Sequence, residues 1–153
     1  MNFGQSFQTW VKILYADIRS SVLVNGWKSE SFPVQRGIRQ GCPLSALLFI
    51  IAAEFMAHRI RSNKCIKGIN ILNPEDNCEV KLLQYADDTL FFVSDKRSLK
   101  TINSELDLFA KVAGPKLNKS KTVIMWLGNS TSKWSIDDLG LSWTDTPIKY
   151  LGF

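Results

Sequence analysis

The sequence predicts an α+β fold in which helices pack on one face of an antiparallel sheet. Residues 3–18 and 98–113 carry apolar side chains at spacings of three and four, the pattern of helices that bury one side. Residues 22–32 and 80–93 each contain two short apolar runs separated by turn residues. Runs joined in this way are typical of hairpins, in which the two strands are antiparallel.

The composition is that of a packed globular protein. Hydrophobic residues make up 45% of the 153 residues and charged residues 22%, which excludes a mainly disordered chain. The length favours one domain. The longest apolar run, residues 44–53 with one interruption at Ser45, is shorter than the ~20 residues that span a bilayer, so we expect no membrane partner.

The N-terminus and the cysteines predict an intracellular protein, in the cytoplasm or the nucleus. No basic segment leads into an apolar one after Met1, so we expect no secretory leader. Cys42, Cys65 and Cys78 are odd in number and match no zinc spacing, so we expect reduced thiols.

The first half of the chain contains a helix, a hairpin and a second helix. We expect the apolar stripe of the helix in residues 3–18 to lie in the core. Asn25-Gly26 supplies the positive φ angles that a type I′ hairpin turn needs. Residues 44–61, directly after Pro43, are apolar nearly all round and turn polar near Arg59, which predicts a helix that enters a core.

The second half contains another helix and several strands. Gly114-Pro115 ends the helix predicted for residues 98–113. The predicted strands are residues 80–84, 90–93, 122–127 and 148–153. The first two flank the turn of residues 85–89.

Asp87 and Asp88 stand at the predicted tip of this hairpin. Two adjacent carboxylates repel each other unless a cation neutralises them. Magnesium takes one or two carboxylates and completes its shell with substrate phosphates, which suits nucleotidyl transfer. The alternative is a solvated turn, since Asp is a common turn residue. Large apolar residues on both sides favour the metal site, because they place the turn on buried strands.

Residues 36–45, read as RGIRQGCPLS, interleave basic residues with glycines before a long helix. The two glycines let the backbone approach a ligand, and Pro43 suits the first position of the helix. Backbone amides and Arg39 at such a helix entry are suited to phosphates or to a base pair being formed. The alternative is an ordinary loop that leads into a helix.

The order of these motifs resembles a known family. Residues 36–49, read as RGIRQGCPLSALLF, and the later Tyr85-Ala86-Asp87-Asp88 resemble the palm of a reverse transcriptase, most closely the non-LTR retrotransposon type of the long interspersed elements. The segment from Gln40 to Ser45 resembles motif B, and Tyr85 to Asp88 resembles motif C. Residues 117–122 resemble motif D, and residues 149–152 resemble the strand after it.

The resemblance implies an RNA-directed DNA polymerase that works on an RNA template with a DNA primer and deoxynucleoside triphosphates. Asp87 and Asp88 would hold the catalytic Mg²⁺, with Mn²⁺ as a possible substitute. Lys121 would lie near the triphosphate and stabilise the leaving pyrophosphate. The residues implied in binding nucleic acid or nucleotide are Arg36, Gly37, Arg39, Gln40, Gly41 and Tyr85.

One departure from the family is an absence. The family completes its metal site with a further Asp upstream of motif B, and Asp17 does not replace it because it falls on the first predicted helix. We therefore expect residues 1–153 to be a partial reverse transcriptase domain, running from motif B to the strand after motif D. Motif A, the fingers and the thumb would belong to missing segments of a parent polypeptide, and the fragment would be inactive alone.

Two other hypotheses remain. The net charge of +5 is unevenly distributed, since residues 55–74 and 110–122 each contain four basic residues and no acidic residue. With Arg36 and Arg39, these stretches suit a non-catalytic module that binds nucleic acid. The third hypothesis is a degenerate remnant of a mobile element.

Overall fold

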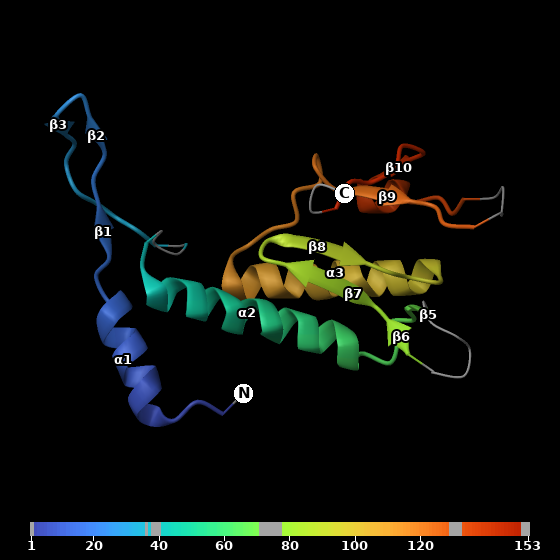
Figure 1. Ribbon diagram of the computed structural model, residues 1–153, viewed down its shortest axis with the longest axis horizontal. Helices are drawn as coiled ribbons and strands as arrows, with labels where there is room; N and C mark the ends of the chain where they lie inside the picture. The colour runs from blue at the N-terminus through green and yellow to red at the C-terminus, as the bar shows by residue number, and fades with distance from the viewer. Residues whose placement is uncertain (1, 36, 38–40, 71–77, 129–132, 151–153) are drawn as a thin grey trace. The chain divides into compact units, whose positions relative to one another are not determined.

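The structure, a computed structural model, describes residues 2–35, 37, 41–70, 78–128 and 133–150. It divides into two compact units, Met1–Ser45 and Ala46–Phe153. Helices and short strands are both present, which confirms the predicted α+β class (Figure 1).

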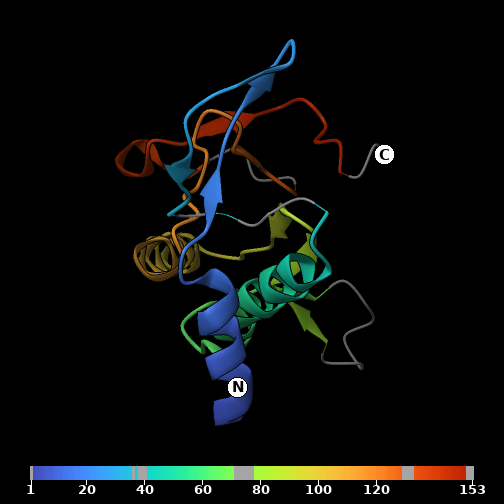
Figure 2. The same cartoon turned by 90° about the vertical axis from the view of Figure 1, so that its left-hand side faces the viewer.

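The first unit contains helix α1 (Gln5–Tyr15) followed by a narrow antiparallel hairpin (Figure 1 and Figure 2). Its strands are β1 (Arg19–Ser20), β2 (Leu23–Val24), β3 (Trp27–Lys28) and β4 (Phe32–Pro33). The β1 strand pairs with β4, and β2 pairs with β3. Asn25 and Gly26 have φ angles of 50° and 85°, so the predicted hairpin and its turn are confirmed.

The expected burial of the first helix is wrong. No residue of α1 is buried, and Trp10 and Leu14 are 63% and 56% exposed. The amphipathic pattern did form a helix. Within the first unit, the two-residue strands offer no sheet wide enough to cover its apolar stripe.

The two predicted long helices are confirmed. Helix α2 (Pro43–Ser62) begins in the first unit and continues in the second, and α3 (Lys96–Ala113) lies in the second. The α3 helix starts two residues before its predicted start because Asp95 caps it, accepting the backbone N–H of Ser98 at 2.7 Å. Gly114, at φ 95°, ends it.

The strands of the second unit form two-stranded ladders. They are β5 (Ile69–Asn70), β6 (Glu79–Val80), β7 (Leu82–Tyr85), β8 (Asp88–Phe91), β9 (Val123–Met125) and β10 (Ser142–Thr144). The pairs β5–β6 and β7–β8 are antiparallel, whereas β9–β10 is parallel. A short 3₁₀ helix, η2 (Asp137–Leu139), lies between β9 and β10.

Two predicted strands differ from the structure. The strand expected for residues 80–84 is interrupted at Lys81, which separates the end of β6 from the start of β7. Residues 148–150 form no strand, since none of the described segments pairs with them, and residues 151–153 lie outside the described part of the chain.

The core of the second unit joins both helices to the β7–β8 hairpin. Its buried side chains are Met56, Ala57, Ile60, Ile66, Leu82 and Ile102. Phe91 of β8 packs against this cluster, so the root of the hairpin is held from both strands. Figure 1 shows the hairpin lying along α2 and α3.

Among the described residues, α2 is the one helix long and apolar enough to cross a membrane by length and composition. A core helix passes the same test. The α2 helix supplies Met56, Ala57 and Ile60 to the core of the second unit, but only 17% of its apolar window is buried.

Gly68 is required by a close approach of two backbones. A Cβ atom at this position would lie 2.2 Å from the carbonyl oxygen of Val80, at the start of the β5–β6 ladder. We expect Gly68→Ala to lower the free energy of unfolding by about 1–3 kcal/mol, the usual cost of forcing an extra carbon into a packed site. Urea unfolding followed by circular dichroism measures this loss.

The matched control is Gly4→Ala, since a Cβ at Gly4 meets nothing within 4 Å. Equal stabilities of the two variants would contradict the close approach at Gly68.

Asp95 makes the stability of α3 depend on pH. The backbone N–H of Ser98 lowers the pKa of Asp95 below its ordinary value of 3.8. The charged cap therefore stabilises the fold fully above the unfolded pKa, and this contribution is lost as pH falls through the folded pKa. In Asp95→Asn the cap does not titrate. We expect the difference in unfolding free energy between wild type and Asp95→Asn to shrink as the pH is lowered from 7 through the folded pKa, which lies below 3.8. A constant difference across that range would contradict this role.

Candidate active site

The β7–β8 hairpin carries both candidate aspartates on a tight turn. Its register pairs Leu82 with Phe91 at the root and Tyr85 with Asp88 at the tip. Only Ala86 and Asp87 remain as turn residues, so the turn is shorter than the five residues predicted from sequence. Asp88 belongs to β8 and Asp87 to the turn.

The hairpin changes from buried at its root to exposed at its tip. Leu82 is 8% exposed, whereas Tyr85 is 65% exposed. Asp87 and Asp88 are also exposed. The apolar root therefore anchors the hairpin in the core and presents two carboxylates and a tyrosine ring to solvent.

Ala86 has a φ of 51°, which is uncommon for a residue with a Cβ atom. This left-handed conformation costs roughly 1–2 kcal/mol for a non-glycine residue. Such strain is found preferentially at functional sites, where the surrounding structure holds the residue in place. Here the paired strands on both sides hold it, and the turn places Asp87 directly beside Asp88.

The chain contains a second pair of adjacent aspartates, Asp137 and Asp138, which differs from the first. Asp137 accepts a hydrogen bond from Ser135 at 2.9 Å, and Asp138 forms an ion pair with Lys100. The hydrogen bond from Lys100 lowers the pKa of Asp138. Among the described residues, no such side-chain hydrogen bond or ion pair engages Asp87 or Asp88. The hairpin pair is therefore the one available for an external cation.

The donor set at the hairpin tip fits a magnesium ion that shares its shell with a substrate. In the described ranges, no three His, Cys, Asp or Glu side chains gather closely enough to enclose a metal. Two exposed carboxylates are nevertheless the number that Mg²⁺ takes from a protein when phosphates and water complete its shell. The residues that would hold it are Asp87 and Asp88.

Lys121 lies in a turn that begins at Asn118. The backbone N–H groups of Lys121 and Thr122 both donate to the carbonyl oxygen of Asn118, each at 3.0 Å. The Lys121 side chain is exposed, whereas Lys119 uses its ammonium to bind the carbonyl oxygen of Leu139 at 2.7 Å. Within the described residues, no interaction joins Lys121 to the aspartate pair.

The glycine-rich loop belongs to the first unit. Gly37 and Gly41 have φ angles of 98° and 78°, which only glycine adopts without strain, so both glycines are needed for the path of the chain. The predicted binding residues Arg36, Arg39 and Gln40 lie outside the described residues. Tyr85, another predicted binding residue, pairs with Asp88 across the hairpin.

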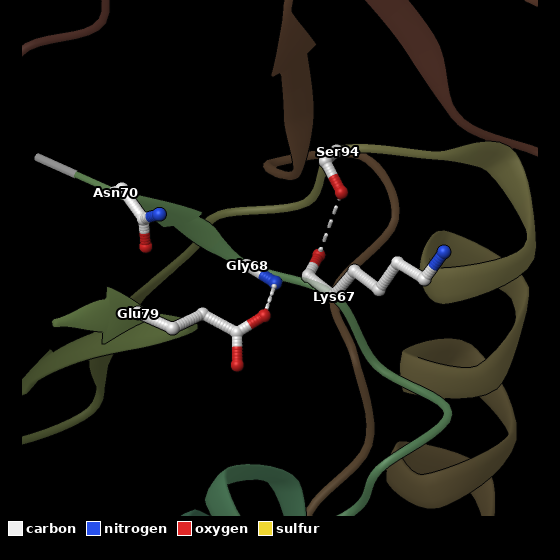
Figure 3. Close-up of a pocket in the computed structure, with 5 residues that line it drawn as sticks. All are labelled: Lys67, Gly68, Asn70, Glu79 and Ser94. Atoms are coloured by element: carbon white, nitrogen blue, oxygen red, sulfur yellow. Dashed lines mark hydrogen bonds between the residues drawn. The ribbon is translucent and has the colours of Figure 1, made fainter. Parts of the chain in front are cut away.

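Sequence patterns did not predict a polar hollow of about 480 Å³ at the root of the hairpin. Figure 3 shows its lining residues, Lys67, Gly68, Asn70, Glu79 and Ser94. Glu79 accepts the backbone N–H of Gly68 at 2.7 Å, and Ser94 donates to the carbonyl oxygen of Lys67 at 3.4 Å. These bonds hold neighbouring segments together, at the end of the hairpin opposite to Asp87.

Comparison with known proteins gives one family. Residues 1–153 match the family described as reverse transcriptase (RNA-dependent DNA polymerase). The chain is 30% identical to a Transposon TX1 149 kDa protein of Xenopus laevis, over 99% of this chain and 11% of that protein. It is 28% identical to the Pol polyprotein of the type-2 retrotransposable element R2DM of Drosophila melanogaster, over 76% of this chain and 10% of that protein. The chain thus spans about a tenth of these relatives' length.

The strained turn gives a test of the hairpin geometry. We expect Ala86→Val to destabilise the protein by about 1–3 kcal/mol, because a β-branched residue tolerates a positive φ poorly. Ala86→Gly removes the strain and is expected to keep or raise stability, since glycine adopts this conformation freely. Thermal unfolding by circular dichroism compares the two. A valine variant as stable as the glycine variant would contradict the left-handed turn.

Proposed function

The chain belongs to the reverse transcriptase family, and we propose that it supplies the palm of an RNA-directed DNA polymerase from a non-LTR retrotransposon. The observation that carries the proposal is the exposed Asp87–Asp88 pair on a hairpin rooted in the core. Its reaction is nucleotidyl transfer. The substrates are deoxynucleoside triphosphates and a DNA primer paired to an RNA template.

Asp87 and Asp88 are proposed to hold divalent cations, Mg²⁺ or Mn²⁺. Such ions, when bound, polarise the phosphate that is attacked and neutralise the charge that develops on it. The hairpin root keeps the carboxylates at a fixed place, and the exposed Tyr85 ring is suited to contact a nucleotide.

The remaining proposed roles belong to Lys121 and to the glycine-rich segment before α2. Lys121 is proposed to offer its ammonium to the leaving pyrophosphate, which its exposure permits. Gly37 and Gly41, with Arg36, Arg39 and Gln40, are proposed to contact the template and the incoming nucleotide. The positive φ angles of the two glycines support a loop that presents its backbone to a ligand.

We also propose that the 153 residues alone do not polymerise. The support is that no third carboxylate gathers with Asp87 and Asp88 in the described part of the chain. An upstream motif A segment and a thumb of a longer polypeptide would complete the site. The relatives, which are about ten times longer than their matched segments, are consistent with this. Such a protein is proposed to act inside the cell, in the cytoplasm or the nucleus.

A specific observation favours a second candidate, a module that binds nucleic acid without catalysis. In residues 110–122, the ammonium groups of Lys111, Lys116 and Lys121 are in no ion pair within the described structure. In contrast, Arg59 and Lys67 of the other basic stretch are paired with Glu105 and Asp95. The segment 110–122 is therefore the better candidate for phosphate contact.

Metal binding tests the first proposal without requiring activity. Electron paramagnetic resonance detects free Mn²⁺, and the signal of the free ion falls when a protein binds it. We expect the wild-type chain to bind Mn²⁺, and the double variant Asp87→Asn/Asp88→Asn to lose at least tenfold in affinity, because a site with two carboxylates loses both charges. Excess Mg²⁺ should compete.

The matched control is Asp137→Asn/Asp138→Asn, which also removes two adjacent charges. It should bind Mn²⁺ as the wild type does, because Lys100 and Ser135 already occupy those carboxylates. Metal binding that survives the hairpin change would contradict the proposal. Salt-dependent binding of an RNA–DNA duplex that is the same with and without Mg²⁺ and unaffected by the hairpin change would favour the second candidate.

A further inference from the structure

A hydrogen bond between two distant side chains holds the start of α2. The hydroxyl groups of Tyr15, the last residue of α1, and Ser45, in the first turn of α2, lie 2.8 Å apart. The two residues are 30 positions apart in the chain, and both belong to the first unit.

The bond satisfies a buried polar group. Ser45 is 1% exposed, although most of the first unit is open to solvent. A buried hydroxyl without a partner is costly, because it gives up its bonds to water. Tyr15 supplies that partner and remains partly buried itself.

The same turn continues directly into the glycine-rich loop. The backbone N–H of Ser45 donates to the carbonyl oxygen of Cys42 at 3.1 Å. Gly41, with a φ of 78°, precedes Cys42. A constraint on the Ser45 side chain therefore also fixes the backbone at Cys42 and Gly41, where the first helical turn meets the loop.

We propose that Tyr15 is a positioning residue for this loop. Its hydroxyl fixes the first turn of α2 and thereby the orientation of the Gly41–Cys42 backbone toward the nucleic acid. The proposal rests on the proposed function, in which Gly41 contacts template or nucleotide. Tyr15 touches no substrate, and it acts through Ser45.

The hydroxyl groups of Tyr15 and Ser45 can be removed one after the other, which gives a test. Tyr15→Phe keeps the ring and leaves a buried Ser45 hydroxyl without its partner, so it should lower the melting temperature. Adding Ser45→Ala removes that unsatisfied group, so the double variant should regain most of the lost stability. The double variant still lacks the bond, and a positioning defect should therefore persist in it.

The alkylation rate of Cys42 by iodoacetamide reports on this turn, with the exposed Cys65 and Cys78 as references in the same molecule. Mass spectrometry of peptides separates the three sites. We expect Cys42 to react about fivefold faster in Tyr15→Phe and in the double variant, the factor that corresponds to one hydrogen bond of about 1 kcal/mol. The control Thr9→Val removes a hydroxyl group from an exposed position of the same helix and should leave the alkylation rate of Cys42 unchanged.

Fluorescence anisotropy with a labelled RNA–DNA primer–template then measures affinity. We expect both variants that lack the bond to bind about fivefold more weakly than wild type, by the same factor. If Cys42 reactivity and affinity return to wild type together with the melting temperature in the double variant, Tyr15 is only structural and the proposal is wrong. An unchanged Cys42 rate in Tyr15→Phe would equally overturn it.

Failure of the proposed function gives a different result. A wild-type chain that does not bind the primer–template contradicts that function and the role of Tyr15 toward nucleic acid. The alkylation rates still decide whether Tyr15 holds the Gly41–Cys42 turn, because they need no nucleic acid.

Discussion

Burial of the β7–β8 root is the constraint on which the arrangement of the second unit depends. Leu82 and Phe91, which pair across the hairpin, pack with Ile60 of α2 and Ile102 of α3. Burying a side chain of this size contributes roughly 1.5–3 kcal/mol relative to leaving it exposed. The root therefore has one favourable position. The tip pair, Tyr85 and Asp88, lies three residue pairs beyond the root pair, so the position of the root determines the position of the tip.

In that arrangement, the residues that stabilise the hairpin are different from the residues proposed to bind the cation. The apolar root supplies the packing, and the tip places Asp87 and Asp88 side by side with no partner from the described chain. A pair of carboxylates contributes no stability of its own, because the charges repel. Ala86 likewise contributes no stability at this turn, because its φ of 51° is unfavourable. Two unfavourable features at one turn are understandable if the turn serves a ligand, as we propose for the divalent cation.

Sequence reasoning worked where periodicity and turn chemistry decide the structure. Helix α2, helix α3, the Asn25-Gly26 turn and the position of the aspartates at a hairpin tip were predictable for this reason. The burial of α1 was not, because the spacing of Trp10 and Leu14 shows that a helix has an apolar side and says nothing of what covers it. The parallel β9–β10 pair depends on a distant partner, and β5 has only two residues, too few for a pattern. For the candidate site, the sequence predicted the two strands and the aspartates between them. It did not predict the two-residue turn or the different surroundings of the two aspartate pairs, because both depend on how the folded chain packs.

The claim that Asp87 and Asp88 hold a divalent cation can be tested at the level of single peptide bonds. Fe²⁺ bound in place of Mg²⁺ generates hydroxyl radicals with peroxide and ascorbate, and these radicals cleave the backbone close to the metal. The account predicts cleavage of the wild-type chain within residues 85–89, suppressed by excess Mg²⁺. Cleavage at other positions, such as around Asp137 and Asp138, with none near the hairpin tip, would contradict it.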